Sequence, residues 1–233
     1  MNNSSSSNTG LVIGIVAVTV ALFAGLVLLL SHTSSEPNAI QDENVTFNDA
    51  ADPTYGSSSA PLAIHMYEDF ECPACHASYP IMKQVMETYK NRIQFIWKDF
   101  PLQQMHPSAR PSANAARCAQ SQGKFWEYQD QLFSSRDWVT ATDKVSAFVA
   151  LAKNVTGLNA DLFRSCVSNN AQDSLVARTM SEGYSNHVDA TPTFFVGKKR
   201  MFAMSFSDWQ KTLDATLAQL GATTTPTVAT STR

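Results

Sequence analysis

The hydrophobic residues of this 233-residue chain form one long apolar run near the N-terminus and shorter periodic segments from about residue 60 onward. Residues 11–30 are twenty positions without a charge, which is long enough to cross the hydrocarbon core of a membrane. The run lacks the basic start and the small-residue cleavage site of a secretory signal. We therefore predict an uncleaved transmembrane anchor behind a short polar tail at 1–10, with a cleaved signal as the alternative.

Polar residues follow the anchor and also close the chain. Residues 31–59 are rich in Ser, Asn, Asp, Pro and Thr, a composition typical of a flexible linker. Residues 222–233 are rich in Thr and are predicted to form a disordered tail. Between these segments, residues 60–221 are predicted to form the folded domain.

Strand and helix periodicities alternate at the start of that domain. Leu62, Ile64 and Met66 alternate with their neighbours as in a buried strand, and residues 93–100 form a second apolar run. A helix is predicted from Cys72 onward, between these two strands. Its apolar residues recur at helical spacing: Tyr79, Ile81, Met82, Val85, Met86 and Tyr89. A strand, a helix and a parallel strand form a right-handed crossover unit.

The rest of the domain is predicted to contain a helical block, a hairpin and one more helix. Helical patterns occupy most of about 104–186, namely 107–133 with a break at Gly123, 143–152, 159–168 and 173–184. Residues 193–196 give a third strand that pairs back with 201–203, and a last helix opens near Trp209. The predicted fold class is therefore α/β, with a helical insertion inside a strand-and-helix core.

The charge of the chain excludes one class of function. The chain has 17 basic and 20 acidic residues, a formal net charge of −3. Its basic run, Lys198-Lys199-Arg200, lies between two strand signals and is predicted to be a solvated turn. Nucleic-acid binding requires a basic patch, so the composition argues against a nucleic-acid partner.

The strongest chemical signal is Cys72-Pro73-Ala74-Cys75, two thiols three residues apart at the predicted start of a helix. Residues at that spacing share a helix face, so the thiols can close and reopen a small disulfide ring. Pro73 suits the first helical turn, where a missing N–H costs nothing. The helix N-terminus lowers the pKa of Cys72, which makes the disulfide easy to reduce. We predict a redox-active pair.

Three other interpretations of this motif are open. A zinc site needs a second close pair of ligands, whereas Cys118 and Cys166 each stand alone. The motif followed by His76 also matches covalent haem attachment, but its flanking segments are strand-like and not helical. A purely structural disulfide is the third. The residues favour the redox site, and no metal or other cofactor is predicted.

Two further features bear on the site. Glu68, Asp69 and Glu71 would oppose thiolate formation at Cys72 if they lay close to it; otherwise they are exposed loop charges. Thr191-Pro192 directly precedes the third strand. A peptide bond before proline can be cis at modest cost, so Thr191–Pro192 can be a cis bond. The alternative is a trans proline that opens the strand.

The cysteines outside the motif are expected to pair. Cys118 and Cys166 both lie in the predicted helical insertion, and leftover cysteines of an exported protein usually form a disulfide. We predict a structural disulfide between them, with two buried free thiols as the alternative.

Three separated motifs resemble the DsbA-like branch of the thioredoxin superfamily, the type with a helical insertion. They are DFECPAC at 69–75, GKFWEY at 123–128 and ATPTFFV at 190–196. The resemblance implies a thioredoxin fold over about 60–221. It implies that Cys72 is the exposed nucleophile and Cys75 the buried resolving thiol.

The same resemblance implies roles for residues beside the thiols. Pro192 would be cis and pack beside the disulfide, and Thr191 would offer backbone hydrogen bonds to a bound peptide. Pro73 and Ala74 would tune the redox pair, and Ala74 departs from the His of the best-known oxidase. His76 either substitutes for that imidazole in part or faces solvent.

The implied activity is that of a dithiol oxidase on the extracytoplasmic side of the cell membrane. Its partners would be reduced or unfolded exported proteins and a membrane quinone-linked partner that reoxidises the dithiol. A reductase or isomerase of the same fold is one alternative. A membrane-tethered, chaperone-like binding module with an incidental C-x-x-C is the other.

Overall fold

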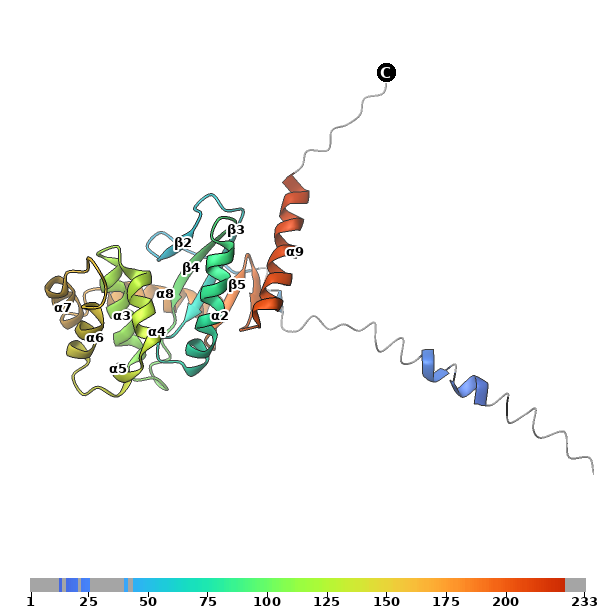
Figure 1. Ribbon diagram of the computed structural model, residues 1–233, viewed down its shortest axis with the longest axis horizontal. Helices are drawn as coiled ribbons and strands as arrows, with labels where there is room; N and C mark the ends of the chain where they lie inside the picture. The colour runs from blue at the N-terminus through green and yellow to red at the C-terminus, as the bar shows by residue number, and fades with distance from the viewer. Residues whose placement is uncertain (1–12, 14–15, 21, 26–39, 42–43, 225–233) are drawn as a thin grey trace, which may run out of the picture. The chain divides into compact units, whose positions relative to one another are not determined.

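The computed structural model describes residues 13, 16–20, 22–25, 40–41 and 44–224 (Figure 1). The predicted tail at 1–10, half of the predicted span at 11–30, residues 31–39 and the end of the chain from 225 lie outside them. Among the described helices, none combines the length and the apolar character that a membrane span requires. The chain divides into two units, Met1–Pro37 and Asn38–Arg233, and the second contains the fold described below.

A mixed β-sheet forms the centre of the second unit. Within the described residues its strand order is β1-β6-β5-β3-β4-β2. The central strands β3 and β4 are parallel, and the remaining neighbours pair antiparallel. The strands are β1 (Ile40–Gln41), β2 (Thr54–Gly56), β3 (Leu62–Glu68), β4 (Ile93–Asp99), β5 (Thr193–Val196) and β6 (Lys199–Met201).

Helices surround this sheet and extend beyond one end of it. In Figure 1, α3 to α7 gather at one end of the folded unit and α9 lies at the other. The helices are α2 (Pro73–Tyr89), α3 (Ala109–Gln120), α4 (Phe125–Ser134), α5 (Asp137–Thr140), α6 (Lys144–Ala152), α7 (Ala160–Ser168), α8 (Asp173–Ser185) and α9 (Phe206–Thr224). The predicted crossover is β3-α2-β4, and the helical block lies between β4 and β5.

Strand alternation decides which side chains meet which helices. Ile64 and Met66 of β3 lie in the main core cluster together with α2 and α9. Tyr67, on the opposite face of β3, packs with Val45 and Phe195 in a second cluster. Successive strand residues point to opposite faces, so α2 and α9 cover one face of the sheet and other segments cover the second.

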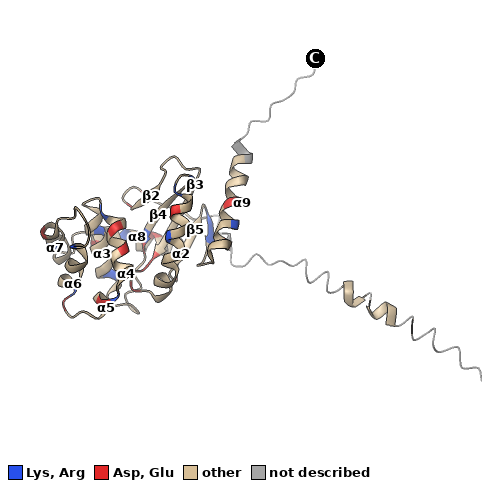
Figure 2. Ribbon diagram, in the orientation of Figure 1, with Lys and Arg blue, Asp and Glu red and all other residues tan. Residues whose placement is uncertain are grey.

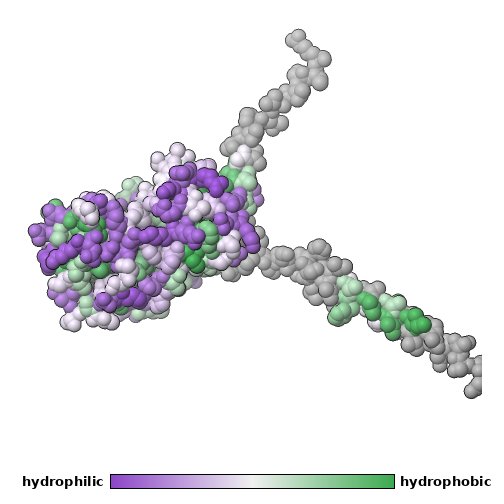
Figure 3. All heavy atoms as spheres, in the orientation of Figure 1, coloured by the Kyte–Doolittle hydropathy of each residue, from purple (hydrophilic) through white to green (hydrophobic). Residues whose placement is uncertain are grey.

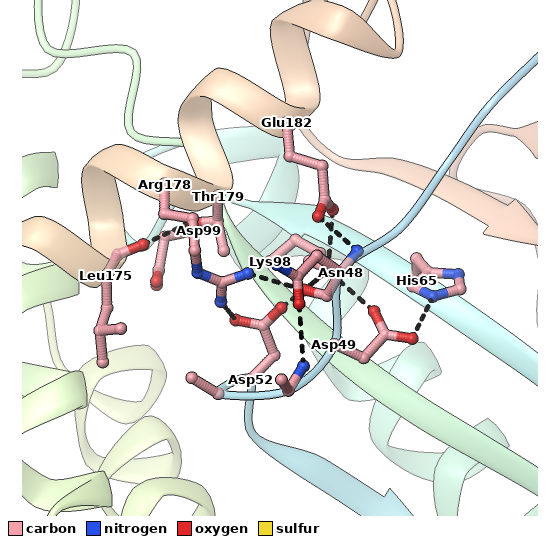
Figure 4. Close-up of polar contacts among 12 residues, drawn as sticks. Asn48, Asp49, Asp52, His65, Lys98, Asp99, Leu175, Arg178, Thr179 and Glu182 are labelled. Atoms are coloured by element: carbon pink, nitrogen blue, oxygen red, sulfur yellow. Dashed lines mark hydrogen bonds and ion pairs between the residues drawn. The ribbon is translucent and has the colours of Figure 1, made fainter.

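The prediction of a flexible linker is wrong for residues 44–59, because these residues belong to the fold. Residues 54–56 form β2, which pairs with β4 at an edge of the sheet, and Val45 is 2% exposed. Asp49 and Asp52 hold the Lys98 ammonium at 2.9 and 2.7 Å (Figure 4). The polar composition of this segment therefore includes carboxylates that pair with the buried Lys98.

Lys98 is the centre of a buried charge network. Its side chain is fully buried, and besides the two aspartates it contacts Glu182 of α8 at 2.8 Å. The equally buried Arg117 of α3 contacts Asp52 at 2.9 Å and Asp99 at 2.6 Å. Buried charges persist only where they are paired. The network thus fastens the N-terminal segment and the helical insertion to β4.

The prediction of a solvated turn at 198–200 holds only in part, because Arg200 is buried. Arg200 is 7% exposed, and it donates a 2.6 Å hydrogen bond to the carbonyl oxygen of Asn186. Its guanidinium also lies 5.3 Å from the centre of the Phe195 ring. An arginine can bury the apolar part of its side chain against an aromatic ring. A run of three basic residues in the sequence does not show that one of them is buried in this way.

The visible surface of the folded unit is mixed in charge and largely hydrophilic. The positions of basic and acidic residues are interspersed along the ribbon in Figure 2. Figure 3 shows hydrophilic residues over most of this face, with apolar residues in separate small groups.

Candidate active site

The two cysteines of the motif lie where β3 gives way to α2. Cys72 is the N-cap residue, with extended backbone angles, and Pro73 is the first helical residue. Both thiols are free in this structure; Cys72 is 6% exposed and Cys75 is fully buried. Pro73 and Ala74, between them, are exposed. Access from solvent is thus greater at Cys72.

Hydrogen bonds stabilise a thiolate at Cys72. The largest contribution is the hydrogen bond from the Cys75 thiol. The Thr191 side chain and the backbone N–H groups of Cys75 and Ala74 make smaller contributions. Burial opposes these effects, but together they lower the pKa of Cys72 to about 5. An N-terminal helical position is a setting in which cysteine thiols are known to acidify.

Cys75 has the opposite character. Burial is the main cause that raises the pKa of its thiol well above the ordinary value of 9.0, and the neighbouring Cys72 and Glu68 add to that effect. At neutral pH the pair therefore consists of one thiolate and one buried thiol. This division of roles suits one sulfur that exchanges with outside partners and one that resolves the product.

Glu68 is a buried carboxyl group behind the thiols. It ends β3 and is 5% exposed, and burial raises its pKa to about 8 although it forms a hydrogen bond with Cys75. From the sequence, one interpretation of Glu68, Asp69 and Glu71 is that they are exposed loop charges. The structure excludes that interpretation, because Asp69 and Glu71 are also buried, at 1% and 8% exposed.

Asp69 and Glu71 connect the cysteine motif to the segment that follows β4. The Asp69 carboxylate accepts hydrogen bonds from the backbone N–H of Leu102 at 3.0 Å and from Nδ1 of His106 at 2.7 Å. Glu71 accepts from the backbone N–H of Ser108 at 2.5 Å. These contacts hold the motif against the start of the helical insertion. His106 carried no sequence signal, since its partner lies 37 residues away.

The loop before β5 closes over the thiols. The Thr191–Pro192 peptide bond is cis, and both residues are buried. The Cys72 sulfur lies 3.3 Å from the carbonyl oxygen of Thr191. The structure therefore brings the two predicted halves of the site together.

His76 and the second pair of cysteines lie apart from this contact. The half-buried His76 ring faces Phe133 of α4, with 6.4 Å between ring centres. Cys118 and Cys166 form a disulfide that joins α3 to α7 within the insertion. In the described part of the chain, His, Cys, Asp and Glu side chains form no cluster of three or more that could hold a metal ion.

Comparisons with known proteins agree with this arrangement. A family model described as Thioredoxin matches residues 48–215. Na(+)/H(+) antiporter NhaA 3 of Salinispora tropica is 31% identical over 145 residues, which are 62% of this chain and 21% of that protein. NhaA 1 of Salinispora arenicola matches to the same extent. The chain thus spans about a fifth of the length of these curated relatives.

Solved structures share the fold at low sequence identity. Oxidised BdbD from Bacillus subtilis has a TM-score of 0.63 and 19% identity, with 78% of this chain and 98% of that one covered. DsbA from Chlamydia trachomatis has a TM-score of 0.62 and 18% identity, covering 77% and 95%. Alpha-DsbA1 from Wolbachia pipientis has a TM-score of 0.64 and 16% identity, covering 77% and 96%.

Proposed function

Because this chain belongs to the Thioredoxin family, we propose that it is a protein thiol-disulfide oxidoreductase that works through Cys72 and Cys75. The observation that carries the proposal is the asymmetry of the pair. The pKa of Cys72 is lowered to about 5, whereas that of the buried Cys75 is raised. A structural disulfide has no need of such a difference, but a thiol-exchange site does.

The exchange starts from the oxidised Cys72–Cys75 disulfide and a reduced client. A client thiolate attacks the Cys72 sulfur, the Cys72–Cys75 bond breaks, and its electron pair goes to the Cys75 sulfur. Glu68, protonated at neutral pH and hydrogen-bonded to Cys75, is placed to supply the proton that this sulfur takes up. The product is a mixed disulfide between Cys72 and the client.

A second client thiolate then resolves the mixed disulfide. It attacks the client sulfur, a new client disulfide forms, and Cys72 leaves as a thiolate. A thiol with a low pKa leaves more readily, which favours this direction. Two electrons have passed from the client to the pair, so the protein oxidises its client. The cis-Pro192 loop lies beside the Cys72 sulfur, which the first client thiolate attacks and which leaves as a thiolate in the second step.

The cellular setting is part of the proposal. We place the domain outside the cell membrane, tethered through residues 11–30, with reduced exported proteins as clients and a membrane redox partner as the oxidant of the dithiol. The apolar run at 11–30 supports the tether. The antiporter activity named for the relatives is not carried over, because the chain spans about a fifth of their length.

The reduction potential of the Cys72–Cys75 couple tests the direction of the reaction. The full-length protein with Cys118→Ala and Cys166→Ala is equilibrated with glutathione buffers, so that a single disulfide titrates. We expect a value above roughly −150 mV, near the −120 mV of DsbA. A value near the −270 mV of thioredoxin would instead identify a reductant.

Loss of the nucleophile tests whether the thiols matter at all. Cys72→Ser should abolish oxidation of a reduced, unfolded client, while Ala74→Ser, at an exposed position between the cysteines, should retain it. If Cys72→Ser keeps full cellular function, the chain is a tethered binding module and the oxidoreductase proposal is wrong.

A further inference from the structure

A cavity lies along α2 next to the turn that carries the thiols. It encloses about 400 Å³ between α2, α4 and β2, within the size range of small-ligand sites. The first lining residue along α2 is Tyr79, four residues after Cys75, and Lys83 follows one turn later. Neither Cys72 nor Cys75 is among the residues that line the cavity.

Aromatic rings form the walls of the cavity. The Tyr55 and Trp126 rings meet edge to face, 5.6 Å apart, and the Trp126 indole N–H donates a 2.9 Å hydrogen bond to the carbonyl oxygen of Thr54. Tyr79, on the wall formed by α2, stacks on Phe133 with 4.3 Å between ring centres. Each ring is held by a neighbour, so the walls are preformed.

Carboxylates surround these rings. Glu87, Glu127 and Asp130 line the cavity together with Lys83. The Lys83 ammonium contacts Asp130 at 2.7 Å and lies 5.9 Å from the centre of the Tyr79 ring. The chain's own lysine thus already shows that this combination of ring and carboxylate accepts a cation. Glu127 pairs with Lys124 at 3.2 Å in an exposed contact, which leaves it accessible to a second cation.

Gln129 is a largely buried polar residue on the wall of the cavity. It is only 4% exposed, and it lines the cavity. Among the residues that the structure describes, its side-chain amide has no hydrogen-bond partner. The amide is not one of the unpaired polar groups that are closed off from solvent, so it faces the open space of the cavity. Its carbonyl oxygen and its amino group are available to a molecule inside the cavity.

We propose that this cavity binds an organic cation with an apolar stem, of the kind found at the end of an arginine or lysine side chain. The rings take the stem and the face of the cation, Glu127 balances its charge, and Gln129 pairs with the adjacent N–H or carbonyl group. Gly123, Trp126 and Glu127 belong to the GKFWEY motif at 123–128, for which the thiol chemistry gives no role. The cation comes either from a basic residue of a polypeptide or from a free small amine.

Binding is measured on the full-length protein by NMR. The chain has four tryptophans, of which Trp97, Trp138 and Trp209 are buried in the core. The indole N–H signal of Trp126 is assigned by its loss in Trp126→Phe. The probes are Nα-acetylarginine amide, its neutral analogue Nα-acetylcitrulline amide, and propylguanidine. We expect saturable shifts of the Trp126 signal with both guanidinium probes and at least about threefold weaker binding of the citrulline probe.

Two variants connect the binding to the named groups. Glu127→Gln should weaken guanidinium binding about threefold, whereas Asp161→Asn, the same loss of charge on the surface of α7, should not change it. Gln129→Met should weaken binding without lowering the unfolding midpoint, because methionine has a similar shape and the replaced amide makes no hydrogen bond within the described protein. Tighter binding of the arginine amide than of propylguanidine identifies a polypeptide source, and equal binding identifies a free amine.

The proposal is overturned if the citrulline and arginine probes shift the Trp126 signal alike, or if binding survives unchanged in both Glu127→Gln and Gln129→Met. A lower unfolding midpoint for Gln129→Met would also overturn the role of Gln129, since it would show that the amide supports the fold. None of these readouts involves thiol exchange, so they stand apart from the test of the oxidoreductase.

Discussion

The Cys72 sulfur lies 3.3 Å from the carbonyl oxygen of Thr191, a residue 119 positions further along the chain. A carbonyl oxygen can accept a hydrogen bond from the protonated thiol, but it offers nothing to a thiolate. The low pKa of Cys72 therefore comes from other groups, chiefly the Cys75 thiol, with the Thr191 side chain and the N–H groups of the first turn of α2 adding to it. The cis-proline loop restricts access to this sulfur, and the helix end sets its charge.

The charge of Cys72 predicts how the reduction potential depends on pH. With the pKa of Cys72 at about 5 and that of Cys75 raised, reduction at pH 6 to 7 takes up one proton for two electrons. The potential should then fall by about 30 mV per pH unit, against about 59 mV per unit below pH 5, where both sulfurs are protonated. Glutathione or dithiothreitol equilibration at pH 4 to 7 measures the slope. A uniform slope of about 59 mV per unit would contradict the low pKa.

The pKa of Glu68 makes a second prediction, about stability. Burial raises this pKa from 4.5 to about 8, so the folded protein binds the proton more tightly than the unfolded chain between these values. The group's contribution to the free energy of unfolding therefore falls as the pH rises from 4.5 to 8 and stays constant above. Between pH 5 and pH 8 the wild type should lose on the order of a few kcal/mol of its free energy of unfolding through Glu68. Glu68→Gln cannot ionise and should not show this loss.

Urea unfolding of the reduced protein at pH 5 and pH 8 measures this difference for the wild type and for Glu68→Gln. Glu127→Gln is the matched control, because Glu127 is exposed and should leave the pH dependence of stability as it is. If the free energy of unfolding changed equally between pH 5 and pH 8 in the wild type and in Glu68→Gln, Glu68 would be ionised in the folded protein.

Lys98 supports a third prediction, for the charge network behind the sheet. Lys98→Met leaves Asp52 and Glu182 facing each other without the ammonium that lies 2.7 and 2.8 Å from them. Removing one partner of a buried ion pair typically costs about 3–5 kcal/mol. Lys90→Met removes an exposed lysine paired with Glu87 at 2.9 Å and should cost less than about 1 kcal/mol. Urea unfolding compares the two, and equal costs would show that the network is not needed for stability.

The sequence predicted those parts of the molecule whose signals are local. The alternation at Leu62, Ile64 and Met66 and the apolar run at 93–100 correspond to β3 and β4. The spacing of the two motif cysteines placed them on one turn of α2. The prediction of a thioredoxin fold is confirmed by the matching family model and by the solved structures. In each case neighbours in sequence are also neighbours in space.

The missed features depend on partners far along the chain. Asp49 and Asp52 belong to a segment that composition presents as a linker, and their partners Lys98 and Arg117 lie far along the chain. A charged residue at the end of a strand is ordinarily expected in solvent, so Glu68 was not singled out as a buried group. Neither its burial nor its hydrogen bond to Cys75 leaves a periodic signal.

Gly183 of α8 supports the last prediction, because it sets how closely this helix approaches the sheet. A Cβ atom at this position would lie 2.6 Å from Cδ2 of Phe100 and 3.0 Å from Cε1 of Tyr67. The Phe100 ring also packs edge to face on Tyr184, 5.0 Å away, so it cannot easily move aside. Gly183→Ala should therefore lower the free energy of unfolding by about 1–3 kcal/mol, although alanine is the better helix former.

Gly221, in α9, is the matched control. A Cβ atom there meets no neighbour within 4 Å, so Gly221→Ala should raise stability by up to about 1 kcal/mol through helix propensity alone. Opposite signs for the same substitution in two helices would identify the close packing of α8 on Phe100 and Tyr67 as the cause. If Gly183→Ala stabilised the protein as well, α8 would have to move away from the sheet at little cost. The ion pair between Glu182 and Lys98 should then weaken, and Lys98→Met should become less costly in that background.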